Sequence, residues 1–230
     1  CAFGLYLYGT SDGRYAFFDY PSLANIGFEY FLLASSLLFI KKMAHLILAS
    51  GSPRRKELLL QVGLDFSIHS PDIDESVLEH EQIEQYVQRL AESKAKVVLA
   101  LHPQSTVIAV DTSLVFANQI IGKPASKQHA FEIWTLLSGQ KHEVLTGVCV
   151  ANAHQLLSVV VRTEVEFQQF SLNDMEEYWA TGEPLGKAGA YAIQGIAAKY
   201  VTGIKGSYSN VVGLPLHETI QLLDRIDQRS

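Results

Sequence analysis

The chain has 230 residues, 48% of them hydrophobic, and a formal net charge of −6. The apolar content is sufficient for a sizeable core, whereas the acidic balance argues against a duplex nucleic-acid binder, so we expect no nucleic-acid partner. Its two cysteines, Cys1 and Cys149, offer no disulfide framework, which favours a reducing cytoplasm.

Residues 1–42 are rich in aromatic residues and differ in composition from the rest of the chain. Their apolar part, residues 27–40, is shorter than a typical membrane span of about 20 residues. It also lacks the basic start and small-residue cleavage site of a signal peptide. Met43 comes next and is a natural initiator. We interpret 1–42 as translated upstream sequence or an N-terminal extension without a catalytic role, and we expect no membrane association; a membrane tether is the alternative.

The stretch at residues 46–63 has the pattern of an apolar strand, a Ser/Gly turn and a helix. Ser52 suits the N-cap and Pro53 the first helical position. The first turn then carries three cations, where the helix dipole is already positive: Arg54, Arg55 and Lys56. A bound anion would offset this charge, because free N–H groups ringed by Arg form a phosphate site. The alternative is that these cations point into water.

Further along the chain, hydrophobic periodicity and turn residues predict alternating helices and strands. In chain order, we expect a strand at 66–70, a helix at 82–101, a strand at 106–117, a helix at 126–137, a hairpin of 142–151 with 156–168, a short helix at 171–180, a strand-rich stretch at 188–201 and a last helix after Pro215. Helices mixed with hairpins predict an α/β fold with a mixed sheet.

Three polar residues interrupt apolar patterns. Asp111 lies inside a predicted strand, where a carboxylate is costly unless it is paired, binds a metal or lines a cleft; bonding to nearby backbone is the alternative. Lys94 falls on the apolar stripe of its helix and either extends its ammonium into water or reaches a phosphate or carboxylate. Gln194 lies among small residues, and its amide can read a pyrimidine edge or bond within the core.

Metal-binding patterns are few. The run Asp72-Ile-Asp-Glu75 is either a solvated acidic loop or a site for a hard cation, since Mg²⁺ prefers oxygen ligands and phosphate. No Cys/His spacing resembles a zinc site, and the chain has no Walker A or G-x-G-x-x-G loop. We interpret His142 as structural rather than as a metal ligand.

An ordered set of motifs over residues 43–225 resembles the Maf family of nucleoside triphosphate pyrophosphatases. The motifs are S-x-S-P-R-R-x-E-L-L from Ser50, Asp72–Glu75, Tyr86–Ala91, Ala109–Thr112, Gly122-Lys-Pro124, Leu137–Gly139, Thr146-Gly147, Lys187–Gly195 and Gly206–Pro215. The resemblance implies an elongated mixed β-sheet with flanking helices and two lobes around a cleft, shared with inosine triphosphatases and formed by residues 43–230. It also implies hydrolysis of a nucleoside triphosphate to the monophosphate and pyrophosphate.

The resemblance also implies residue roles. Asp111 would be the general base that activates water, and Glu75 with Asp111 would contact a divalent cation, Mg²⁺ or Mn²⁺. The phosphates would be held by Ser50, Arg54, Arg55, Lys94 and Lys123.

Three positions separate two branches of the family. Arg54, Thr112 and Gln194 match the branch that resembles dTTP/UTP pyrophosphatases; the 7-methyl-GTP branch has an aromatic residue, Gln and Glu there. One departure is Gly186, because the family usually has Asp at this position, next to Lys187. The absence of that Asp could weaken activity. The alternatives are a 7-methyl-GTP pyrophosphatase or a nucleotide-binding regulator of cell division with little turnover. A homodimer is a possible assembly.

Overall fold

The computed structural model of the chain describes residues 45–228. They belong to the second of two units into which the chain divides, Cys1–Met43 and Ala44–Ser230. The expected non-catalytic extension at residues 1–42 therefore lies outside the described residues. No helix among residues 45–228 combines the length and apolar character that a membrane span requires.

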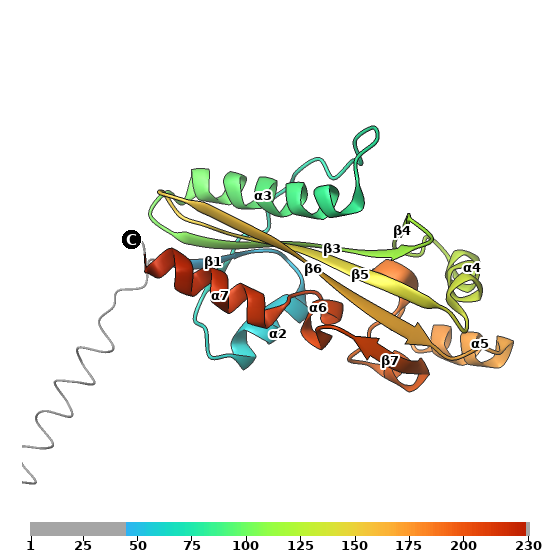
Figure 1. Cartoon of the computed structure of the whole chain (residues 1–230). Helices are drawn as coiled ribbons and strands as arrows, with labels where there is room; N and C mark the ends of the chain where they lie inside the picture. The colour runs from blue at the N-terminus through green and yellow to red at the C-terminus, as the bar shows by residue number, and fades with distance from the viewer. Residues whose placement is uncertain (1–44, 229–230) are drawn as a thin grey trace, which may run out of the picture. The chain divides into compact units, whose positions relative to one another are not determined.

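A seven-stranded mixed sheet forms the centre of this unit (Figure 1). The strand order is β2-β1-β3-β5-β6-β7, with β4 also paired to β3. β1 runs parallel to β2 and β3, and the remaining pairs are antiparallel. The strands are β1 Leu46–Ala49, β2 Ser67–Ile68, β3 Thr106–Phe116, β4 Gln119–Ile121, β5 Lys141–Ala151, β6 Leu156–Phe167 and β7 Val201–Lys205. The predicted α/β fold with a mixed sheet is confirmed.

Helices lie on both faces of the sheet (Figure 1). α3 (Ile83–Leu101) packs against β3 and β5. Across the sheet from α3 lie α2 (Pro53–Gln61), α6 (Tyr208–Val212) and α7 (Leu216–Asp227), whereas α4 (Lys127–Leu137) and α5 (Leu172–Ala180) lie near the other end of the long strands. The larger hydrophobic core cluster of the described residues includes Trp134, Phe167, Tyr178 and Tyr200.

The amphipathic character of α3 explains its position. Its stripe of Val87, Leu90, Ala91, Ala95 and Val98 is buried, and three of these, Ala91, Ala95 and Val98, join strand residues such as Val107 and Ala109 in a second core cluster. β5 approaches so closely that a Cβ at Gly147 would lie 2.2 Å from the carbonyl oxygen of Val87. Glycine is therefore required there, and this close contact sets the distance between α3 and the sheet.

Two predicted elements differ from the structure. The strand at 66–70 shortens to Ser67–Ile68, and the prediction of a strand-rich stretch at 188–201 is wrong. That stretch contains two 3₁₀ helices, η1 (Ala188–Ala190) and η2 (Ile196–Tyr200), and β7 begins only at Val201. Positive φ values at Gly189 and Ala190 turn the chain out of an extended path. Side chains of distant helices then bond its backbone in place of a neighbouring strand.

Candidate active site

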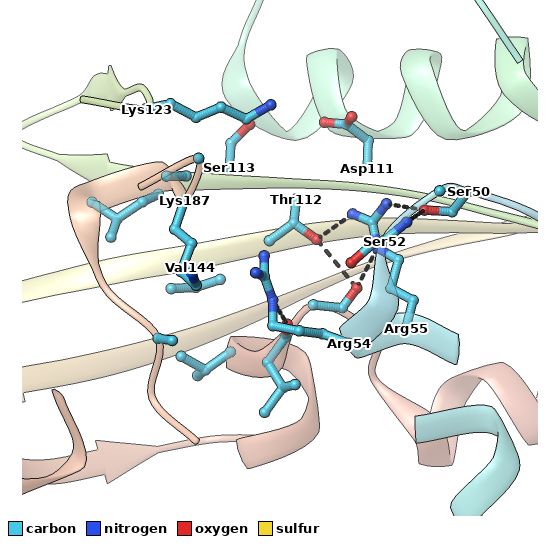
Figure 2. Close-up of a pocket in the computed structure, with 18 of the residues that line it drawn as sticks. Ser50, Ser52, Arg54, Arg55, Asp111, Thr112, Ser113, Lys123, Val144 and Lys187 are labelled. Carbon is cyan, nitrogen blue, oxygen red and sulfur yellow. Dashed lines mark hydrogen bonds between the residues drawn. The ribbon is translucent and has the colours of Figure 1, made fainter. Parts of the chain in front are cut away.

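A cavity of about 600 Å³ opens beside β1, α2, β3 and the loops around η1 and α6 (Figure 2). It brings together every residue that the sequence and the resemblance singled out for substrate, metal or specificity: Ser50, Arg54, Arg55, Glu75, Lys94, Asp111, Thr112, Lys123 and Gln194. These residues come from segments separated by up to 144 positions in the chain, so the cavity is formed by the tertiary fold alone.

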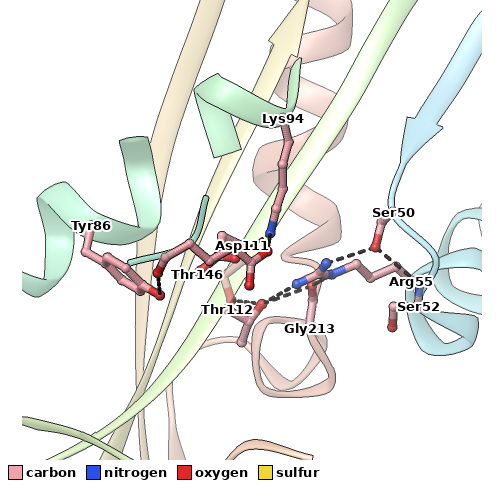
Figure 3. A network of polar contacts seen from close by, with 10 residues as sticks. Ser50, Ser52, Arg55, Tyr86, Lys94, Asp111, Thr112, Thr146 and Gly213 are labelled. Carbon is pink, nitrogen blue, oxygen red and sulfur yellow. Dashed lines mark hydrogen bonds and ion pairs between the residues drawn. The ribbon is translucent and has the colours of Figure 1, made fainter. Parts of the chain in front are cut away.

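A buried carboxylate and a buried ammonium in the cavity lining face one another (Figure 3). Asp111 of β3 is 8% exposed and Lys94 of α3 is 9% exposed. Lys94 Nζ lies 2.8 Å from Asp111 Oδ1 and 2.6 Å from Glu75 Oε1. Lys94 therefore turns inward to two carboxylates and does not extend into water. Asp111, likewise, is a paired carboxylate that lines a cleft.

Glu75 is placed by a contact to its backbone. Tyr86 on α3 donates from its hydroxyl to the Glu75 carbonyl oxygen at 2.9 Å. Burial and the nearby carboxylates of Asp111 and Glu75 raise the pKa of Tyr86, so its hydroxyl remains a donor. Asp74 instead accepts from the amide and hydroxyl of Ser76 in a local turn. Of the acidic run, only Glu75 lines the cavity.

Arg55 is held by three uncharged acceptors (Figure 3). Its guanidinium donates to Ser50 Oγ at 2.9 Å, to Thr112 Oγ1 at 3.0 Å and to the Gly213 carbonyl oxygen at 2.9 Å. Burial lowers the pKa of Arg55 to about 10, which leaves it charged at neutral pH. The wall of the cavity thus carries a fixed positive charge whose three hydrogen-bond partners are all neutral.

The N-terminus of α2 remains open on the cavity side. Ser52 is the N-cap residue, as predicted, but its side chain makes no capping bond. Ser50 Oγ instead accepts from the Ser52 amide at 3.3 Å as well as from Arg55. A hydroxyl with both acceptor positions used keeps its proton free to donate to a bound anion. Of the three first-turn cations, Lys56 points into solvent and does not line the cavity.

Two further lysines approach the cavity from its other side (Figure 2). Lys123 is exposed and follows β4, and the neighbouring Gly122 carbonyl accepts from the Gly189 amide at 3.0 Å. Lys187 donates to the carbonyl oxygens of Glu183 and Leu185. Burial and the nearby charge of Arg54 lower the pKa of Lys187. Among residues 45–228, no ion pair involves Lys123, Lys187, Arg54 or Arg55.

Gly186, where the sequence departs from the family pattern, has a backbone conformation that suits glycine. Its φ of +72° lies in the left-handed region that glycine favours. A Cβ there would meet nothing within 4 Å, so an aspartate is not excluded by space. Lys187 is ordered by the two backbone carbonyls in place of a neighbouring carboxylate.

Some of these contacts cannot be foreseen from the sequence. The carbonyls of Val212 and Gly213, which accept from Arg54 and Arg55, have no sequence signature. From the sequence, Lys187 is named only as part of a motif and not as a site residue. The departure at the neighbouring Gly186 is a signal that could draw attention to it. His142 agrees with its structural interpretation, because it is 1% exposed and bonds the Tyr191 hydroxyl at 2.9 Å.

Comparison with known proteins adds the family. The Maf-like protein family matches residues 45–226. The chain belongs to the Maf family. Among Maf relatives, the dTTP/UTP pyrophosphatase of Acinetobacter baylyi is 62% identical, over 78% of this chain and 98% of that protein. The protein of the same name from Pseudoalteromonas atlantica is 50% identical, over 79% and 96%. A solved structure, the Staphylococcus aureus Ham1 protein, is 15% identical with a TM-score of 0.38, and covers 54% of this chain and 71% of that one.

Proposed function

We propose that this Maf-family chain hydrolyses nucleoside triphosphates, dTTP and UTP above all, to the monophosphate and pyrophosphate. One observation carries the proposal: a single cavity places the paired carboxylate Asp111 opposite cations that have no carboxylate partner among residues 45–228. The names of the relatives that are 62% and 50% identical support the choice of nucleotide.

The cationic side of the cavity suits a triphosphate. Arg55, Arg54 and Lys123 would hold the phosphates, together with the free proton of the Ser50 hydroxyl. Arg55 is fixed by three bonds before substrate arrives, so little ordering is left for the moment of binding. Charge that develops on the phosphate oxygens would meet preorganised donors.

The acidic side suits the activation of water. Asp111 would accept a proton from the water that attacks the α-phosphorus. Lys94 holds its Oδ1 at 2.8 Å, which fixes the carboxylate and leaves the other oxygen for water. Lys94 therefore orients the base, in addition to the phosphate contact that the resemblance implies for it.

Maf-family nucleotide pyrophosphatases generally use a divalent metal. Residues 45–228 contain no cluster of three His, Cys, Asp or Glu side chains that could hold one alone. Glu75 and Asp111 nevertheless lie close together, because both contact the Lys94 ammonium. Two carboxylates plus substrate phosphates are a usual ligand set for Mg²⁺, so these residues fit Mg²⁺ or Mn²⁺. The bound ion would neutralise phosphate charge and make water more acidic.

The specificity residues have different surroundings. Gln194 is exposed and belongs to the cavity lining. Thr112 is already bonded to Arg55 at 3.0 Å and to Thr146 at 3.0 Å. Gln194 would thus read the base directly, whereas Thr112 would act through the position of Arg55. The cytoplasmic location, the possible homodimer and the absence of a nucleic-acid partner stay predictions.

The test is pyrophosphate release from dTTP, UTP, dATP, GTP and 7-methyl-GTP, each with Mg²⁺, Mn²⁺ or a chelator. We expect the highest kcat/KM for dTTP and UTP, and loss of release with the chelator. A preference for 7-methyl-GTP would assign the other branch. Tight nucleotide binding without release would instead indicate a regulator.

A further inference from the structure

The segment Ala190–Ala197, which carries Gln194, is held by side chains from outside the cavity. Trp134 on α4 donates to the Ala190 carbonyl oxygen at 3.1 Å. Two other residues reach the backbone on either side of Gln194. Tyr178 Oη accepts from the Ala192 amide at 3.2 Å, and Glu183 accepts from the amides of Ile196 and Ala197 at 2.8 and 3.2 Å.

Tyr178 and Glu183 also bond to each other. The Tyr178 hydroxyl donates to Glu183 Oε1 at 2.7 Å. The Tyr178 ring is 1% exposed and packs against Trp134 and Tyr200, with centroids 5.2 and 5.7 Å away. Burial opposes ionisation of Glu183, but its hydrogen bonds outweigh this and lower its pKa, so it acts as a pure acceptor. The pair is one rigid bridge between the aromatic core and the segment.

Gly195 makes the bridge possible. A Cβ at this position would lie 2.2 Å from Glu183 Oε2, so no other residue lets the carboxylate approach. Gly195 is the N-cap of η2 and has no side chain to satisfy the first amides of that turn. The Glu183 carboxylate supplies those acceptors from outside the turn.

Neither member of the bridge lines the cavity, whereas Gln194 does. The backbone is therefore fixed two residues before Gln194 and two residues after it, and Gln194 itself is an exposed residue of the cavity lining. We propose that Tyr178 and Glu183 are positioning residues for base selection, which hold the Gln194 amide where it meets a pyrimidine edge. This inference rests on the proposed function.

The test is Tyr178→Phe, which removes one hydroxyl and keeps the ring in its cluster. We expect kcat/KM for dTTP and UTP to fall about tenfold, mainly through KM. The value for GTP should change less, so the pyrimidine-to-purine ratio falls. Inhibition by inorganic tripolyphosphate should be unchanged, because Arg54 and Arg55 bond Val212, Gly213 and Ser50 and make no bond to Tyr178 or Glu183.

The matched control is Tyr200→Phe, which removes a hydroxyl from the neighbouring ring. That hydroxyl bonds the Asp174 carbonyl at 3.1 Å and not the segment, so the ratio should stay at the wild-type value. In a Gln194→Ala background, Tyr178→Phe should have no further effect on the ratio, because the bridge acts through Gln194. If Tyr178→Phe does not fold, Glu183→Gln is used, with the same expected direction.

Equal losses for all nucleotides together with weaker tripolyphosphate inhibition would show a general structural role and overturn the inference. An unchanged ratio in a folded Tyr178→Phe variant would overturn it as well. Wild-type protein that releases no pyrophosphate from dTTP or UTP would contradict the proposed function, and the inference with it. Wild-type activity with an unchanged ratio in the variant contradicts the positioning role alone.

Discussion

Lys94 and Asp111 are joined by a 2.8 Å ion pair across the interface between α3 and the centre of the sheet. Both are almost completely buried, and Glu75 adds a second carboxylate to the same ammonium. Two carboxylates and one lysine leave a net negative charge. In Figure 2, Asp111 lies to the right of Thr112, whereas Lys123 and Lys187 lie to its left. The same cavity therefore holds both a carboxylate pair and cations without a carboxylate partner among residues 45–228, as the proposed function requires.

Base choice should depend on Gln194. Gln194→Glu, alone or with Thr112→Gln, should lower kcat/KM for dTTP and UTP, since a polar group left unpaired against the base costs roughly 1–3 kcal/mol. Arg54 stays in the position that an aromatic residue has in the 7-methyl-GTP branch, which limits any gain on 7-methyl-GTP. The control is Gln221→Glu on the exposed surface of α7. Substrate ratios that stay fixed within error would remove the physical support for pyrimidine recognition.

The close packing of α3 against the sheet should depend on Gly147. In Gly147→Ala, the new methyl group would meet the backbone of Val87, which cannot turn away as a side chain could. We expect the free energy of unfolding to fall by about 3 kcal/mol or more, as for severe overpacking. Gly122→Ala is the control, since a Cβ there meets nothing within 4 Å. Urea unfolding of both variants measures this loss. Equal free energies of unfolding for the two variants would contradict the prediction and show that α3 can shift at little cost.

Most of the fold is predictable from sequence patterns that act locally. The buried stripe of α3 and the apolar strands at 106–116 and 141–151 are visible as periodicity. The strand prediction for 188–201 fails because the apolar residues of this segment pack against α4 and α5, a contact between distant elements. The inward turn of Lys94 is equally hard to predict, since an apolar stripe is compatible with an ammonium in water.

Stability should fall in mild acid because of His142. Burial lowers the pKa of His142 to about 4, below the usual value near 6.5. The unfolded chain therefore binds a proton first, and stability present above pH 6.5 is lost as pH falls toward 4. Between pH 7.5 and 5 this residue alone should cost about 2 kcal/mol. In His142→Gln, the stability difference between these pH values in urea unfolding should shrink by that amount. A difference equal to wild type would contradict a neutral, buried His142.

Residues 1–42 should be dispensable for catalysis. The cavity is lined by residues between Ala49 and Gly213, all of them in the described unit. A variant that begins at Met43 should keep the kcat and KM of the full chain, measured by pyrophosphate release. A truncated protein that is folded but inactive would show that the extension contributes to the site.

The most direct measurement compares turnover and nucleotide binding in Asp111→Asn. The substitution keeps the shape of the side chain but removes the base, so kcat for dTTP should fall by roughly 10²–10⁴-fold. The Kd for the triphosphate should change only a few-fold, because Arg54, Arg55 and Lys123 are intact, and Asp224→Asn on the exposed surface of α7 should retain wild-type kcat. A folded Asp111→Asn protein with near-normal kcat would contradict the assignment of Asp111 as the base, and with it the account of this cavity as the active site.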